Sequence, residues 1–251
     1  MRLRSYLVTN ALMSLALTTG LARPLPPILI DRAECENDYP GTASPPKPVR
    51  PLPPPEFISK DTTLSAAYYN ALSILNTNNQ CSDFFGGPSA MTVLNLLVGQ
   101  ARKDYFASSI AMRMHGETIN GHDARTNTRY RLFTKVSING NGPFYKSGNS
   151  RSERAITGVG SFDPNTEQVR VLILLHELGH LLKRPDGQWL LPDDGGNEEL
   201  SRQNSRRIEE VCRDEFKHVG EEERLRNLAK RNQVNENGSS EEARLESAAD
   251  H

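Results

Sequence analysis

The chain reads VRVLILLHELGHLL over residues 169–182, an apolar run that contains two histidines and one glutamate. Thr166 and Glu167 come just before the run and are typical of a helix start. Because the run is apolar nearly all round, it resembles a helix buried at the centre of a domain. Imidazole and carboxylate groups on such a helix are costly without partners. The sequence therefore predicts a buried central helix whose polar groups form a site.

His176 and His180 are four residues apart, so on a helix both imidazoles project from one face and can bind one metal ion. Glu177 lies one residue further round, where its carboxylate can reach a metal-bound water without binding the metal itself. Zinc suits this set best, because it accepts imidazole ligands and keeps a fourth position for water. We therefore expect Zn²⁺ as the cofactor, His176 and His180 as ligands, and Glu177 as the catalytic general base.

The residues inside the His-Glu-x-x-His motif, Leu178 and Gly179, are uncharged, and its flanks are apolar and free of proline. In these features the motif resembles the active helix of the zincin superfamily of metallopeptidases. The resemblance covers this helix and the sheet expected before it, and it indicates no particular family. It implies a zinc-dependent endopeptidase that hydrolyses peptide bonds and binds its substrate as an added β-strand.

The third metal ligand is expected to be Asp186. It lies ten residues after His176, the spacing at which metzincins place a third histidine or, in the snapalysin-like branch, an aspartate. Pro185 would end the helix and direct Asp186 back at the metal. The chain departs from metzincins in having Lys183 where they have glycine, and in having no methionine after Met114 for a Met-turn.

Other carboxylates stay open as the third ligand. Two lie in a Pro-Asp-Asp-Gly-Gly turn, and four lie further on, where gluzincins take a glutamate from a later helix: Asp193, Asp194, Glu198, Glu199, Glu209 and Glu210. No residue is assigned to stabilise an oxyanion. The downstream cations are expected on helix surfaces, and the two upstream histidines on turns or the surface: Arg206, Arg207, His218, His115 and His122.

The rest of the chain predicts an α+β fold, zincin-like, in which a small antiparallel sheet packs on the buried active-site helix and further helices flank it. Asp61 and Thr62 are expected to cap a helix in which apolar residues recur at helical spacing from Leu64, and a second helix is expected over 89–98, with Gly99 as its stop. Segments 105–115 and 128–138 have the alternation of strands. A charged helix with an apolar stripe at Ile208, Val211, Cys212, Phe216 and Val219 is expected to dock on the domain.

The N-terminus has the layout of a secretory signal over residues 1–22, with arginines at its start, an apolar run and small residues before the cleavage site. A Pro-rich arm or linker follows over 23–60, either a simple tether or a propeptide that covers the cleft. The metallopeptidase domain is expected over 61–220 and a charged, largely disordered tail over 221–251. This order predicts a protein exported to the extracellular space or the periplasm.

Three cysteines lie after the predicted signal. In an oxidising compartment two of them can pair, and Cys81 and Cys212 flank the most structured region, so we expect that disulfide. Cys35, beside the Pro-rich stretch, would then remain unpaired or form an intermolecular bond. Sequence alone leaves the connectivity open.

The charge composition restricts the kinds of binding partner that the chain can have. Thirty Lys and Arg against thirty-one Asp and Glu leave a formal net charge of −1, which argues against a nucleic-acid binder. We expect a monomer that acts on a peptide or protein substrate, with no membrane span after signal cleavage. Two alternatives stay open: a zinc hydrolase of a non-peptide amide or ester, and a zincin-like extracellular binding module that has lost catalysis.

Overall fold

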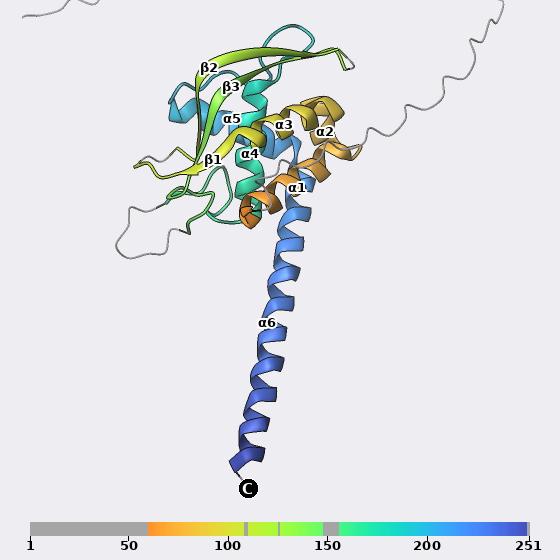
Figure 1. Ribbon diagram of the computed structural model, residues 1–251. Helices are drawn as coiled ribbons and strands as arrows, with labels where there is room; N and C mark the ends of the chain where they lie inside the picture. Colours follow the sequence, from red (N-terminus) through yellow and green to blue (C-terminus); the bar gives the residue numbers. More distant parts are fainter. Residues whose placement is uncertain (1–59, 108–109, 125, 148–155, 250–251) are drawn as a thin grey trace, which may run out of the picture. The chain divides into compact units, whose positions relative to one another are not determined.

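The computed structural model describes residues 60–107, 110–124, 126–147 and 156–249, without the side chains of residues 235–249. The predictions of a signal peptide over 1–22, of a Pro-rich arm over 23–60, except for its last residue, and of the state of Cys35 lie outside the described residues. The described chain is a mixed α+β fold, in which six helices accompany a three-stranded sheet (Figure 1).

Three helices open the described part of the chain: α1 (Thr62–Asn76), α2 (Gln80–Phe85) and α3 (Pro88–Gln100). Asp61 caps α1 as predicted, because its carboxylate accepts a hydrogen bond from the Leu64 amide at 3.0 Å. The second predicted helix is confirmed as α3, but it continues through Gly99 and ends at Gln100. One glycine does not stop this helix, because the neighbouring Leu97 and Val98 are buried in the core.

The sheet differs from the predicted one. It has the order β1-β3-β2, formed by β1 (Ala101–Asp104), β2 (Met112–Asp123) and β3 (Thr128–Asn139). β2 and β3 are antiparallel as expected, whereas β1 runs parallel to β3, so the sheet is mixed. Of the strand expected over 105–115, only residues 112–115 lie in a strand, as the start of β2, while β1 ends just before that segment. The long β2–β3 hairpin supplies its own ladder of backbone hydrogen bonds, which lets a mostly exposed polar stretch be a strand.

The central helix is confirmed as α4 (Glu167–Leu181). Thr166 caps it, since its hydroxyl accepts a hydrogen bond from the Val169 amide at 3.2 Å. Nearly every residue of α4 is buried, because α1, α3, β3 and the two C-terminal helices all pack against it. The apolar run that is uninterrupted in sequence is therefore surrounded by protein in the fold.

Two helices follow, α5 (Glu198–Val211) and α6 (Arg213–Ala249). The expected docking stripe is buried at Ile208, Cys212, Phe216 and Val219 and partly buried at Val211, but it is divided between α5 and α6 where one helix was expected. Beyond it, α6 continues as one helix through Ala249 where a disordered tail was expected from residue 221 (Figure 1). Near the start of this segment His218 Nε2 lies 3.2 Å from Glu222 Oε1 four residues on, a spacing that supports a helix.

The predicted disulfide is confirmed. Cys81 and Cys212 are bonded, with Cα atoms 4.6 Å apart, and both are fully buried. The bond joins the start of α2 to the junction between α5 and α6. It therefore fixes the end of α5 to the N-terminal helices. In the described residues, we find no helix with both the length and the apolar character of a membrane span.

Replacing Cys81 and Cys212 by serine, separately and together, is expected to lower the free energy of unfolding by about 2–5 kcal/mol. The reason is that the bond closes a loop across 131 residues and so restricts the unfolded chain. Urea unfolding measures the change. Because one bond needs both sulfurs, the double variant should lose no more than the single variants. A double variant as stable as the wild type would contradict this role of the disulfide.

Candidate metal centre

The two histidines of α4 lie together as the motif predicts. His176 and His180 are only 6% and 4% exposed, and their Nε2 atoms are 3.0 Å apart. This follows from their spacing, because residues i and i+4 of a helix stand one above the other on the same face. The histidine pair is therefore a buried polar site on an otherwise apolar helix.

After α4 the chain reverses in a tight hairpin. Lys183 and Trp189 form an antiparallel bridge, and the Arg184 amide donates to the Gln188 carbonyl at 2.8 Å. The tip contains Gly187, whose φ of +83° lies in the left-handed region that favours glycine. The returning strand then runs back alongside the end of α4.

Gly179, inside the motif, permits this close return. The Leu191 amide donates to the Gly179 carbonyl at 3.1 Å. A Cβ atom at position 179 would lie 2.5 Å from Leu191 Cδ1 and 2.7 Å from its Cγ, distances that real contacts do not reach. Glycine is thus needed here because the returning chain lies directly on the helix.

The return brings Asp194 to the histidines. Its Oδ2 atom lies 3.2 Å from His176 Nε2 and 3.6 Å from His180 Nε2. The turn is held from α5, where Asn204 donates from Nδ2 to the Pro192 carbonyl at 3.0 Å. The structure therefore assembles His176, His180 and Asp194 into one cluster of possible metal ligands.

Asp186, the expected third ligand, is placed elsewhere. It lies at the tip of the hairpin, with its side chain 57% exposed, and Oδ1 accepts a hydrogen bond from the Gln188 amide at 2.9 Å. Arg184 Nε lies 3.8 Å from the same atom. Pro185 does not direct Asp186 back at the helix, because the chain continues outward before it turns at Gly187. In this structure the third residue of the cluster, its carboxylate, is Asp194, one of the alternatives left open by the sequence.

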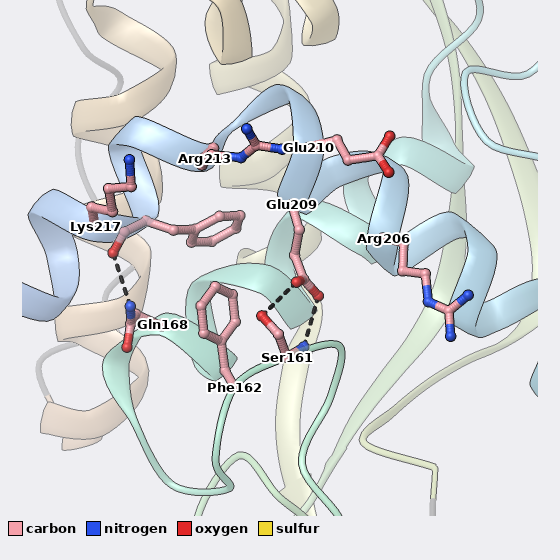
Figure 2. Close-up of a pocket in the computed structure, with 9 residues that line it drawn as sticks. Ser161, Phe162, Gln168, Arg206, Glu209, Glu210, Arg213 and Lys217 are labelled. Atoms are coloured by element: carbon pink, nitrogen blue, oxygen red, sulfur yellow. Dashed lines mark hydrogen bonds between the residues drawn. The ribbon is translucent and has the colours of Figure 1, made fainter.

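The remaining carboxylates also have other places. Glu209 accepts hydrogen bonds from the Ser161 amide at 3.0 Å and from its hydroxyl at 2.6 Å, as Figure 2 shows. Glu199 accepts from Arg202 and Gln203 on its own helix. Asp193 pairs with Arg131 of β3. Glu198 and Glu210 are exposed on α5.

The fixed Glu209 also borders a surface hollow of about 280 Å³ at the elbow between α5 and α6. The hollow is lined by Arg206, Glu209 and Glu210 of α5 (Figure 2). Phe162 and Phe216 also line it, and their ring centres are 5.0 Å apart. None of the three cluster residues lines it. The hollow is therefore separate from the metal centre.

Ser205 is a site residue that the sequence analysis missed. Its Oγ lies 3.1 Å from His176 Nδ1, and the residue is only 2% exposed. A hydrogen bond at Nδ1 fixes the ring orientation, so that Nε2 faces the cluster. The signal available in the sequence was the polar pair Asn204 and Ser205, one turn before the inward-facing Ile208 on the docking face of the helix.

The electrostatics of the cluster match its geometry. Hydrogen bonds from His176 and His180 hold the pKa of Asp194 far below its ordinary value, although partial burial acts in the opposite direction. Burial raises the pKa of Glu177, while the two neighbouring imidazoles lower it. Asp194 is therefore a carboxylate that remains ionised, the form that binds metal.

The three donor atoms fit a metal ion of the size and preference of zinc. Zinc–nitrogen bonds of 2.0–2.1 Å at tetrahedral angles place neighbouring ligand atoms about 3.3 Å apart. The observed separations are 3.0, 3.2 and 3.6 Å. Two imidazoles with one carboxylate also form the ligand set of catalytic zinc sites that keep a fourth position open.

Comparison with known proteins gives no relative: no protein-family model, no curated protein and no solved structure matches this chain.

The cluster predicts a pH effect in the metal-free protein. Burial lowers the pKa of His180, but the hydrogen bond to Asp194 and the nearby Glu177 and Asp193 charges outweigh burial, so the pKa is raised. Protonated His180 then stabilises the fold fully below its unfolded pKa of about 6.5, and this contribution is lost as the pH rises through the raised value.

NMR titration of the ring measures this pKa directly. Asp194→Asn is expected to lower the pKa of His180, because the variant removes the hydrogen-bonded carboxylate charge. Asp186→Asn is the matched control and should leave it unchanged, because Asp186 lies at the hairpin tip. An unchanged pKa in Asp194→Asn would contradict the described cluster.

Proposed function

We propose that this chain is a secreted zinc-dependent metallopeptidase of the zincin type, whose zinc is held by His176, His180 and Asp194. The proposal keeps the cofactor, the histidines and the general base expected from the sequence, and replaces Asp186 by Asp194. The observation that carries it is the convergence of two imidazoles and an ionised carboxylate on a buried helix, at separations suited to one zinc ion.

When bound, zinc supplies Lewis acidity, which lowers the pKa of a water and polarises a substrate carbonyl. Glu177 is adjacent to the ligand His176 and would accept the proton of the attacking water at its carboxylate, then pass it to the leaving nitrogen. Burial raises the pKa of Glu177, so its carboxylate is a stronger base than an exposed one. Ser205 orients the ring of His176, and Asn204 of α5 holds the turn that carries Asp194 through the Pro192 carbonyl.

The proposed substrate is a peptide or protein bound in an extended conformation. In the described part of the chain β2 is at the edge of the sheet and pairs with β3 alone, which leaves a backbone edge for an added strand. The buried Cys81–Cys212 bond supports the extracellular part of the proposal, since disulfides persist in oxidising compartments.

The test is zinc content of the purified protein together with casein hydrolysis. We expect one zinc per chain in the wild type, loss of zinc in Asp194→Ala, and full zinc content in Asp186→Ala, the matched control. Glu177→Gln should retain zinc and lose hydrolysis by about 10²–10⁴-fold, because a general base contributes that much.

The outcomes separate the rival functions. A wild type without zinc contradicts the proposal outright. Zinc retained in Asp194→Ala but lost in Asp186→Ala would restore the ligand expected from the sequence. One zinc without hydrolysis of casein or of a mixed peptide library would favour a binding module, and cleavage of simple esters or amides alone would favour a non-peptide hydrolase.

A further inference from the structure

We propose that Arg131 is a positioning residue of the metal centre, acting with Asp193 as a clamp on the two ligands His180 and Asp194. The inference rests on the proposed function, because it concerns the same site. Arg131 lies on β3, 45 residues before the motif, and no pattern in the sequence connects it with the histidines.

All three nitrogens of the Arg131 guanidinium are used. Nε donates to the carbonyl of His180 at 2.9 Å, and Nη1 and Nη2 donate to the two carboxylate oxygens of Asp193, Nη1 at 3.0 Å. The His180 carbonyl is in the last turn of α4, where carbonyls lack a partner within the helix. One side chain thus joins the sheet, the end of the active helix and the turn that carries Asp194.

The clamp is rigid because the guanidinium is also packed. Its central carbon lies 4.1 Å from the ring centre of Trp189, and the Arg131 side chain is only 11% exposed. Trp189 belongs to the returning strand of the hairpin, in a bridge with Lys183. Stacking and a bidentate carboxylate pair are interactions that arginine makes and lysine cannot reproduce.

The clamp assigns different roles to two adjacent aspartates. Arg131 holds the Asp193 carboxylate on its own side, while the next side chain, Asp194, contacts the histidines. The guanidinium charge also balances Asp193, whereas Asp194 is paired with the two imidazoles of the cluster. Without Arg131, Asp193 would be released and could compete for the metal.

Asp193 also faces the outer nitrogen of a ligand. His180 Nδ1 is buried and has no hydrogen-bond partner within the described residues, and the Asp193 Oδ1 atom lies 4.0 Å from it. A histidine that binds metal through one ring nitrogen is normally oriented by a carboxylate or carbonyl at the other. Arg131 therefore holds the carboxylate that faces His180 at this position.

The test measures zinc affinity by competition with a chromophoric chelator, using zinc alone as the probe. Arg131→Gln and Asp193→Asn are each expected to weaken zinc binding by about 10–100-fold, the usual effect of removing a group that orients a ligand. Because both act through one pair, the double variant should be no weaker than the weaker single variant. The zinc affinity of Arg131→Lys should lie between the affinities of Arg131→Gln and the wild type.

Arg184→Gln is the matched control, since Arg184 pairs with Asp186 in the same hairpin and should bind zinc like the wild type. The Co²⁺ absorption spectrum of each variant adds a readout of ligand geometry, and it should change in Arg131→Gln but not in Arg184→Gln. Circular dichroism and the thermal midpoint show that each variant is folded.

Wild-type zinc affinity and an unchanged Co²⁺ spectrum in Arg131→Gln and Arg131→Lys would overturn the clamp and leave the proposed function intact. Fully additive losses in the double variant would also overturn it, because independent residues do not form a clamp. A wild type that binds no zinc would overturn the proposed function, and the clamp with it.

Discussion

The Leu191 side chain lies directly against Gly179, and this close approach determines where Asp194, the carboxylate of the cluster, lies. The contact lets the chain after α4 return along the helix and follow it with backbone hydrogen bonds at Leu182 and Gly179. Three residues beyond Leu191 the chain reaches Asp194. A Cβ atom at position 179 would overlap the Leu191 side chain, so Leu191 would have to move from its place on the helix.

Two neighbouring elements hold the returned chain. On one side α5 contributes the buried Asn204 to the Pro192 carbonyl and Ser205 to His176. On the other side β3 contributes Arg131. The disulfide at Cys212 fixes the end of α5 to α2, so the covalent bond and the polar contacts of the site act on the same helix. The site thus depends on α4, α5 and β3, three elements that are distant in sequence.

The features that follow local rules could be predicted from the sequence. His176, Glu177 and His180 share a helix whose period fixes their relation, and the Thr166 cap and the apolar run define that helix. The Cys81–Cys212 pair followed from the two cysteines that flank the structured region. The parallel pairing of β1 and the continued helix of α6 were not predicted, because strand pairing and helix persistence in a charged segment depend on partners and on summed local interactions.

The carboxylate that completes the cluster could not be chosen from sequence spacing, because the path of the chain after the helix determines which aspartate reaches the histidines. Asp186 has the spacing seen in one family, but Pro185 and Gly187 form an outward hairpin tip, and the chain returns eight residues later at Asp194. The signals were present as Gly179, the Gly187 turn and the polar pair Asn204–Ser205. The role of each of these residues follows only from the contact that it makes in the fold.

The measurement that tests this account most directly is a crystal structure of the zinc-loaded protein with anomalous diffraction at the zinc edge. We predict one anomalous peak bound by Nε2 of His176, Nε2 of His180 and a carboxylate oxygen of Asp194, with Asp186 remote at the hairpin tip. A peak bound by Asp186 or by a glutamate of α5, or no peak between the two histidines, would contradict it.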